Sequence, residues 1–297
     1  MREHLDIFPV KAMCTALEVS RSGFYKWLEK TKETSEKEWE DAALKMDIRQ
    51  MHEESRKTYG RPRLHLGLQA KGRHCGKHRL VRLMKEEGIE GLQRRRFRVK
   101  TTDSNHPYAV APNLLEGHPG PSKPDEIWVA DITYVRTEEG WSYLAAVLDM
   151  FSRKIAGWSM SARIDRELTI TALKRALRNR RAPDIHHSDR GSQYACHEYR
   201  DLLGDYGIEA SMSRKGNPYD NATMESFFGT IKTEEIQGRI YPSRQAARAE
   251  LFAYIEAFYN TTRIHTSLAG LSPCQLEMQW NAELNGNGKE VAALGIG

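Results

Sequence analysis

The sequence has 297 residues, of which 39% are hydrophobic and 29% charged, with a formal net charge of +5. That composition is typical of a globular protein with a polar surface, long enough for one large domain or two smaller ones. No run approaches the roughly 20 apolar residues of a membrane span, and the start "MREHLDIFPV" lacks a signal-peptide core. The four scattered cysteines indicate neither a disulfide framework nor a zinc knuckle, so a reducing cytoplasm is expected.

Residues 1–100 are predicted to be helical. The stretch "PVKAMCTALEVSRSGFYKWLEK" predicts helices at about 9–17 and 21–30, with Ser20 as the cap of the second. This spacing is typical of a helix-turn-helix, although many helical hairpins share it. The second helix is expected to expose Arg21, Ser22 and Lys26 and to pack Phe24, Trp27 and Leu28. A charged helix and a second helical pair, "RPRLHLGLQAKG" and "GKHRLVRLMKEEG", complete the region.

Positive charge is concentrated in the second half of this region. Between Arg56 and Lys100 there are fifteen Lys or Arg and three acidic residues, a local balance of +12. Such a segment attracts polyanions by counterion release. A solvated basic linker is the alternative, but DNA binding is favoured. The candidate DNA contacts are Arg21 and Lys26 in the helical pair and, in "LQRRRFRVK", Arg94, Arg95, Arg96 and Arg98.

Residues 101–124 are rich in Pro, Gly, Ser and Asn without a clear period and are predicted to be a linker.

Residues 125–282 have an α/β order. Three β-like stretches, "EIWVADITYVR", "WSYLAAVLDM" and "KIAGWSMS", are joined by short turns and predict an antiparallel meander. Helices then alternate with the short strands "DIHHS" and "IEASMS". This order is typical of a ribonuclease H-like fold, a mixed sheet with helices on both faces. Residues 283–297 are expected to be a flexible tail.

The stretch "NPYDNATMESFFGTIKTE" at 217–234 predicts a helix with two different faces. The apolar residues Met224, Phe227, Phe228 and Ile231 form a stripe for the core. The opposite face carries Asn221, Glu225, Gly229 and Lys232. A glycine in a helix costs roughly 1 kcal/mol relative to alanine, which makes sense if something bulky must approach Glu225. Taken alone, Glu225 is more often a solvated surface residue.

Three acidic residues are the candidates for chemistry. Asp131 lies in the middle of the first strand, where a carboxylate is costly unless it is paired or bound to a cation. Asp189 follows the short strand "DIHHS", at an end where α/β folds tend to place their sites. Glu225 follows Asp189 after 35 intervening residues. If these carboxylates meet, their oxygens could hold two Mg²⁺ ions, as in-line phosphoryl transfer requires. Asp149, at another strand end, is interpreted as a turn residue rather than a fourth ligand.

The block "WVADITYV … HHSDRGSQY … NPYDNATMESFFGTIKTE" resembles the catalytic core of DDE transposases and retroviral-type integrases. More narrowly, the chain resembles the second-reading-frame (OrfB-type) product of bacterial insertion sequences of the IS-three family. The resemblance extends over "FPVKAMCTALEVSRSGFYKWL", "RKTYGRPRLH" and "YIEAFYNTTRIHTSLAGLSPCQLE", and so covers nearly the whole chain.

The resemblance implies that Asp131, Asp189 and Glu225 are catalytic acids holding two Mg²⁺ ions, with Mn²⁺ as a substitute. It implies DNA cleavage and strand transfer at insertion-sequence ends, with the terminal inverted repeats and target DNA as partners. It also implies that Lys232 contacts DNA near the active site, and Asn221 could orient a ligand or a phosphate. For His187, Arg263 and His265 a structural role and a role at the site both stay open.

In this family the active enzyme is often a longer frameshift fusion, so the partners could include a first-reading-frame protein as well as further copies of this chain. The function expected is that of a Mg²⁺-dependent DDE transposase acting at the bacterial nucleoid. The alternatives are a catalytically weak DNA-binding partner or regulator of a fusion transposase, and a hydrolytic nuclease of the same fold.

Overall fold

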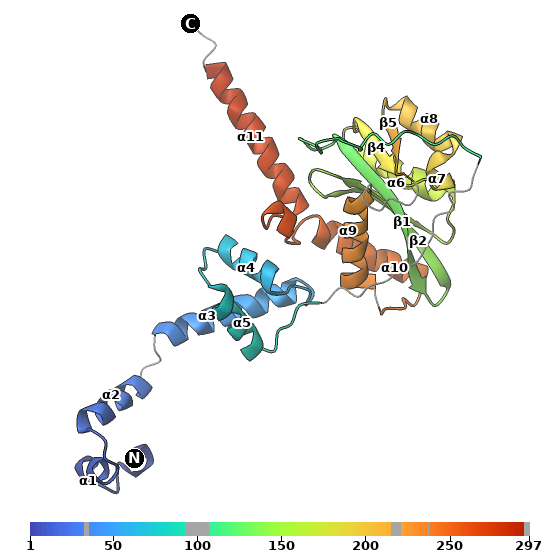
Figure 1. The fold of residues 1–297 in the computed structure, drawn as a ribbon. Helices are drawn as coiled ribbons and strands as arrows, with labels where there is room; N and C mark the ends of the chain where they lie inside the picture. Colours follow the sequence, from blue (N-terminus) through green and yellow to red (C-terminus); the bar gives the residue numbers. More distant parts are fainter. Residues whose placement is uncertain (33–35, 93–106, 215–220, 237, 294–297) are drawn as a thin grey trace.

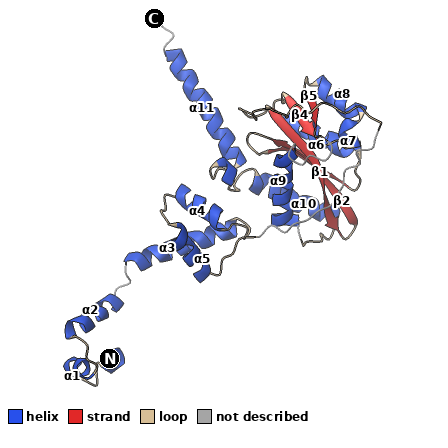
Figure 2. Cartoon of the chain, in the orientation of Figure 1, coloured by secondary structure: helices blue, strands red, loops and turns tan. Residues whose placement is uncertain are grey.

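The computed structural model describes residues 1–32, 36–92, 107–214, 221–236 and 238–293. It consists of a series of helices, a five-stranded sheet with helices on both faces, and a closing helix (Figures 1 and 2). The four arginines at positions 94, 95, 96 and 98 lie outside the described residues. None of the helices in the described ranges combines the length and the apolarity needed to cross a bilayer.

The first helical pair is α1 (Val10–Ala16) and α2 (Arg21–Lys32), preceded by a short turn η1 (Arg2–His4). Ser20 caps α2 as predicted, because its Oγ accepts a hydrogen bond of 3.0 Å from the Gly23 N–H. Phe24 is buried, but Trp27 is 48% exposed, so the expectation that Trp27 packs was wrong. Its ring stacks on that of Phe24, with ring centres 6.0 Å apart, and it lines an open pocket with Met1, Arg2 and Val19, so its neighbours cover it only in part.

The second helical group is α3 (Glu36–Glu54), α4 (Arg61–Ala70) and α5 (Lys77–Glu86), as the sequence predicted. Its core contains the side chains Leu44, Ile48, Leu64, Leu68, Leu80 and Leu83. On the surface, Asp41 of α3 accepts hydrogen bonds of 2.6 Å from both Arg79 and Arg82 of α5. Side-chain hydrogen bonding to Arg82 lowers the pKa of Asp41, which is the direction expected for a paired carboxylate.

The sheet has the order β3-β2-β1-β4-β5. Its strands are β1 (Ile127–Thr137), β2 (Gly140–Asp149), β3 (Ile155–Ser161), β4 (Ile185–Ser188) and β5 (Glu209–Met212). The first three form the predicted antiparallel meander, while β4 pairs in parallel with β1 and with β5. This mixed sheet, with helices on both faces, confirms the ribonuclease H-like fold class.

One face of the sheet is covered by α6 (Arg166–Asn179), α7 (Ser192–Ala195) and α8 (His197–Asp205). Trp128 of β1 packs in this layer. The close approach of α6 to β3 requires a glycine, since a Cβ on Gly157 would lie 2.4 Å from the Ala172 carbonyl oxygen. The other face is covered by α9 (Ala222–Ile231), the π-helical segments η3 (Lys232–Ile236) and η4 (Ala253–Tyr259), and α10 (Arg244–Phe252).

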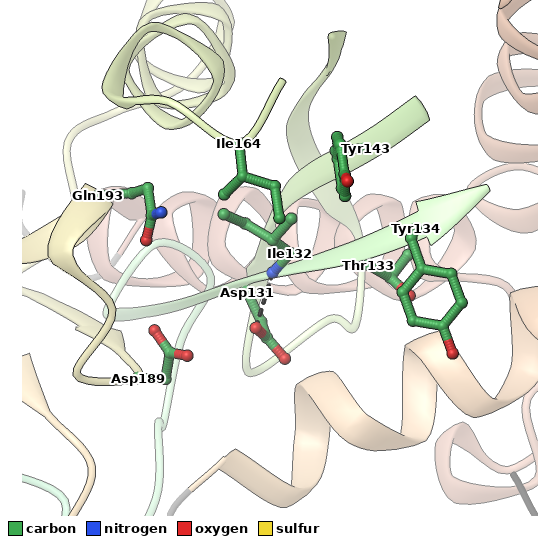
Figure 3. Close-up of a pocket in the computed structure, with 8 residues that line it drawn as sticks. All are labelled: Asp131, Ile132, Thr133, Tyr134, Tyr143, Ile164, Asp189 and Gln193. Atoms are coloured by element: carbon green, nitrogen blue, oxygen red, sulfur yellow. Dashed lines mark hydrogen bonds between the residues drawn. The ribbon is translucent and has the colours of Figure 1, made fainter. Parts of the chain in front are cut away.

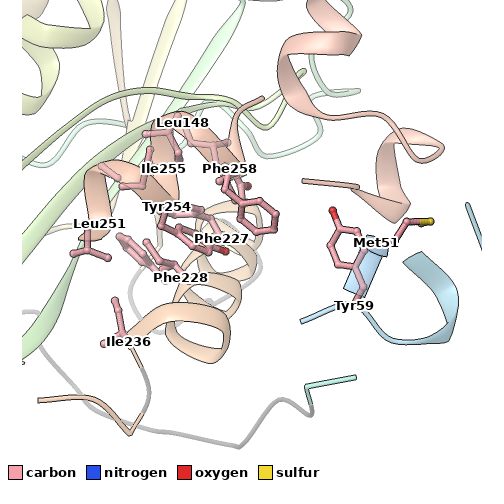
Figure 4. Packing of buried hydrophobic residues seen from close by; sticks show 14 of the residues in the cluster. Met51, Tyr59, Leu148, Phe227, Phe228, Ile236, Leu251, Tyr254, Ile255 and Phe258 are labelled. Atoms are coloured by element: carbon pink, nitrogen blue, oxygen red, sulfur yellow. The ribbon is translucent and has the colours of Figure 1, made fainter. Parts of the chain in front are cut away.

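The helical group α3–α5 shares its core with this second layer (Figure 4). Tyr59 lies 6.4 Å from the ring of Phe258, and its hydroxyl accepts a hydrogen bond of 2.6 Å from the Ile264 N–H. A Cβ on Gly67 of α4 would lie 3.1 Å from Ile264. A short turn η5 (Thr266–Leu268) and the long helix α11 (Pro273–Ala293) complete the chain.

A buried ion pair joins the same parts of the chain. Glu234 of η3 accepts hydrogen bonds from Arg263 at 2.6 and 2.8 Å, from Arg63 of α4 at 3.1 Å and from the Tyr254 hydroxyl at 2.8 Å. Arg263 is therefore structural, which settles one alternative that the sequence left open.

Replacing Glu234 by glutamine should lower the free energy of unfolding by about 3 kcal/mol, because it leaves the buried guanidinium of Arg263 and the partly buried one of Arg63 without their shared counter-charge. Urea denaturation of the full chain measures this. Glu250→Gln is the matched control: Glu250 pairs with Arg56 at 3.5 Å from a half-exposed position, and its loss should cost less than about 1 kcal/mol. Equal losses in the two variants would contradict the structural role given to Glu234.

Candidate active site

Asp131 and Asp189 are neighbours because of the register between β1 and β4. The last pair in that parallel ladder is Ala130 with Ser188, and each aspartate is the next residue along its own strand. Adjacent strands lie roughly 4.8 Å apart, so the two carboxylates leave the sheet side by side. Both line one small pocket at this edge (Figure 3).

Backbone N–H groups just after each aspartate hold these side chains. The Asp131 carboxylate accepts a hydrogen bond of 2.7 Å from the Ile132 N–H, and the Asp189 carboxylate accepts one of 2.9 Å from the Gly191 N–H. A Cβ on Gly191 would lie 3.0 Å from Asp189 Oδ1, so the glycine allows the tight turn that places the second aspartate.

The pair is electrostatically unfavourable without a cation. Burial, and after it the nearby Asp189, raise the pKa of Asp131 to about 8. The Ile132 N–H and Lys232 lower this pKa, while Glu225 raises it to a smaller extent than Asp189. A carboxyl pKa this high indicates that the negative charge of Asp131 is not fully compensated by nearby cations. Strongly shifted pKa values of this kind are frequent at functional sites.

Glu225 reaches the same region from α9. Its side chain is exposed, on a helix whose buried residues are the predicted ones, Met224, Phe227, Phe228 and Ile231. Lys232 extends from the end of this helix to the ring of Tyr134 on β1, with its Nζ 4.6 Å from the ring centre. The face of α9 that carries Glu225 and Lys232 therefore lies toward β1.

Within the described residues, no three His, Cys, Asp or Glu side chains are close enough together to hold a metal ion. The donors nevertheless suit a divalent cation. They are carboxylate oxygens, the ligands that Mg²⁺ and Mn²⁺ prefer, and two of them lie close enough to raise a pKa by repulsion. A further oxygen, Oδ1 of Asn221 at the N-terminus of α9, is buried and has no hydrogen-bond partner among the described residues.

The remaining sequence candidates divide into structural and exposed residues. His187 is fully buried between the hydroxyls of Ser211 and Ser213, at 2.8 and 2.9 Å, which favours the packing role. Asp149 is a turn residue as predicted: its carboxylate accepts the N–H groups of Phe151 and Ser152, at 2.9 and 2.8 Å. Arg21 and Lys26 are exposed on α2, far along the chain from the acidic pair.

Tyr134 and Gln193 are among the pocket residues that were not singled out from the sequence. Alternation along β1 predicts that Tyr134 lies on the face of the sheet opposite Asp131. Because β4 ends opposite Ala130, the described residues flank β1 beyond this point on that side only by an isolated bridge from Thr137 to Tyr241, and side chains from both faces border the pocket. The end of a partner strand cannot be read from periodicity, so no sequence signal pointed to either residue.

The chain matches three domain families. The profile of the "Integrase core domain" family matches residues 121–218, a second family of that description matches 206–273, and the "HTH-like domain" family matches 38–97. The helix-turn-helix match thus covers α3–α5, whereas the spacing in the sequence had pointed to the pair α1–α2.

Two relatives are similar over almost their whole length. The "Insertion element IS600 uncharacterized 31 kDa protein" of Shigella sonnei is 45% identical over 91% of this chain and 98% of its own. The "Transposase InsF for insertion sequence IS3A" of Escherichia coli (strain K12) is 39% identical over 93% of this chain and 96% of its own.

Two solved structures show weaker similarity. A simian T-cell lymphotropic virus intasome is 16% identical, with a TM-score of 0.45 over 77% of this chain and 74% of its own. The HTLV-2 integrase catalytic core in complex with magnesium is 19% identical, with a TM-score of 0.41 over 52% of this chain and 98% of its own.

Proposed function

This chain belongs to the IS3 family of insertion-sequence transposases and is a DDE-type polynucleotidyl transferase, and we propose that Asp131, Asp189 and Glu225 are its catalytic acids. The observation that carries the proposal is the register that sets Asp131 beside Asp189, with Glu225 approaching from α9. The reaction is DNA cleavage followed by strand transfer at insertion-sequence ends.

The metal sites follow from the donor set. Asp131, Asp189 and Glu225 would hold two Mg²⁺ ions, with Mn²⁺ as a substitute. The chemistry that such ions would supply is a lowered pKa of the attacking hydroxyl or water and stabilisation of the charge on the leaving oxygen. Asn221 is proposed to orient a ligand of these ions; its Oδ1, just before the helix that carries Glu225, has no hydrogen-bond partner among the described residues, which supports this role.

Other residues of the chain would position the carboxylates and bind a neighbouring phosphate. The Gly191 N–H fixes the Asp189 carboxylate, and the Ile132 N–H fixes that of Asp131, so neither acid has to be ordered when DNA arrives. Lys232 is partly buried, and desolvation lowers its pKa while Asp131 raises it. A cation held against Tyr134 in this way is suited to the phosphate next to the reacting one.

The partners proposed are the terminal inverted repeats and the target DNA. Two ends must be held together during transfer, so a homo-oligomer is expected in the DNA complex, and a first-reading-frame protein is a further proposed partner. With chromosomal DNA as substrate, the place of action proposed is the bacterial cytoplasm, at the nucleoid.

The test is a strand-transfer assay with labelled insertion-sequence ends and Mg²⁺. The proposal predicts joined products in which a freed 3′-hydroxyl has attacked a second phosphodiester. Cut DNA without joined ends would identify a nuclease, and binding without either product would favour the regulator of a fusion transposase.

Arg21 and Lys26 are expected to contact DNA phosphates, because both are exposed on α2. Replacing both by glutamine should reduce the slope of log affinity against log salt by about 2, since each phosphate contact contributes about 0.9. Fluorescence anisotropy with a duplex carrying an element end measures the slope. Arg166→Gln, which removes an exposed cation of α6, is the control and should leave it unchanged; equal slopes in all proteins would exclude α2 from the DNA interface.

A further inference from the structure

A second cavity, of about 330 Å³, borders α9 on a different side from Glu225. Thr223, Ser226 and Thr230 line it at spacings of three and four, so they share one face of the helix. The other walls are α4, the end of β2, the turn before β3 and the segment 259–267. Hydroxyl groups on exposed residues form the rim, and buried residues form the floor.

The cavity is positively charged. Three arginines line it, Arg63, Arg153 and Arg263. Arg63 and Arg263 share one carboxylate, that of Glu234, so three cations face one anion. The guanidinium of Arg153 donates a 2.6 Å hydrogen bond to the Thr223 hydroxyl. Burial lowers the pKa of Arg153, and the nearby Tyr259 and Asp149 offset this lowering only in part.

His265 provides an independent sign of a ligand. Its side chain lines the cavity and is only 7% exposed, yet its Nε2 has no hydrogen-bond partner among the described residues. The imidazole packs edge-on against Tyr259, with ring centres 4.8 Å apart, which restricts rotation of the ring. Buried polar atoms without partners are rare in folded proteins, so this nitrogen indicates a missing partner. Burial, together with Arg263 and Arg63, lowers the pKa of His265 to about 3, so the ring would bind an anionic oxygen by taking up a proton with it.

The N-terminus of α9 opens toward the same space. Ala222 and Thr223, the first two residues of the helix, line the cavity, and the preceding Asn221 makes no side-chain hydrogen bond to the helix. The first N–H groups of a helix are unpaired within it and carry partial positive charge, which favours an anion.

We propose that this cavity binds a phosphate group, held by Arg153, the start of α9 and His265. The chemistry suits either a backbone phosphate of bound DNA or free inorganic phosphate. That the bound phosphate belongs to DNA rests on the proposed function, whereas the presence of a phosphate site does not. Because α9 also carries Glu225, an occupied cavity would fix the helix that presents the third carboxylate.

The experiment titrates inorganic phosphate into the full-length chain without divalent metal, at constant ionic strength, by isothermal titration calorimetry. Four proteins are compared: wild type, Arg153→Gln, Ser267→Asp and Ser267→Asn. Ser267 is an exposed residue of the rim, so Ser267→Asp adds a negative charge at the mouth without disturbing the core, and Ser267→Asn is its neutral control.

Wild type and Ser267→Asn should bind one phosphate with equal affinity, while Arg153→Gln and Ser267→Asp should bind at least about tenfold more weakly. A phosphate affinity equal in all four proteins, or no saturable binding to wild type, overturns the proposal.

Duplex binding in the same metal-free buffer then distinguishes a DNA backbone phosphate from free inorganic phosphate as the ligand. Weaker duplex binding by the two impaired variants, with competition by phosphate, identifies a backbone phosphate, and unchanged duplex binding identifies free phosphate. Phosphate binding and duplex binding do not depend on strand transfer. A failure of the catalytic assignment would therefore appear in the strand-transfer assay and not in these two measurements.

Discussion

Glu225→Gln should reduce strand transfer at insertion-sequence ends by about a thousandfold or more. The substitution keeps the size and helix propensity of the side chain but removes the charge that would complete the metal site next to Asp131 and Asp189. Metal ions contribute several kcal/mol to stabilising a transition state of this kind, and each 1.4 kcal/mol corresponds to a factor of ten in rate. The measurement is the single-turnover rate with labelled ends and Mg²⁺.

The matched control is Glu209→Gln, which removes an exposed carboxylate from β5 of the same domain. It should retain the wild-type rate. Both variants should unfold at the wild-type denaturant concentration, because neither carboxylate is buried. A Glu225→Gln protein that transfers strands at the wild-type rate would remove Glu225 from the catalytic acids.

Asp131→Asn should stabilise the metal-free protein, and the gain should grow with pH. The folded-state pKa of Asp131 is raised to about 8 by burial and by Asp189, from an ordinary value of 3.8. Between these values the folded protein retains a proton that the unfolded chain has released, so the free energy of unfolding falls as the pH rises. Asparagine has no such proton, and it can still accept the hydrogen bond of the Ile132 N–H. At about 1.4 kcal/mol per unit of pKa difference, the gain amounts to several kcal/mol at pH 8 and vanishes near pH 4.

Urea denaturation in the presence of a chelator, at several pH values between 4 and 8, measures this gain. Asp201→Asn, an exposed substitution on α8, should follow the wild-type profile. Added Mg²⁺ should stabilise wild type more than Asp131→Asn, because the cation relieves the repulsion that the substitution has already removed. Parallel pH profiles for wild type and Asp131→Asn would mean that Asp131 does not carry the uncompensated charge.

Local features of the fold were predictable from the sequence. The meander β1–β3 follows from short turns between β-like stretches, and the apolar stripe of α9 from helical spacing. Such patterns show which face of an element is apolar, but not whether another element covers it. Trp27 illustrates the limit: it lies on the apolar face of α2, stacked on the buried Phe24, and is nevertheless 48% exposed.

The site depends on contacts between distant parts of the chain. The adjacency of Asp131 and Asp189 comes from the pairing of Ala130 with Ser188, which no periodicity determines, and the resemblance to a known family supplied the expectation. Arg263 shows the same dependence, since its structural role required a partner, Glu234, in a π-helical segment 29 residues upstream. The assignment of the three acids as catalytic stays a prediction, as does the division of the chain into 1–100, 101–124, 125–282 and 283–297.

Anomalous diffraction from crystals of the chain grown with Mn²⁺ and DNA carrying an insertion-sequence end addresses the metal site directly. Two peaks are predicted at this edge of the sheet, within ligand distance of the carboxylates of Asp131, Asp189 and Glu225. Peaks absent from this edge of the sheet, with DNA bound, would contradict the central claim that these carboxylates share cations to move phosphodiester bonds.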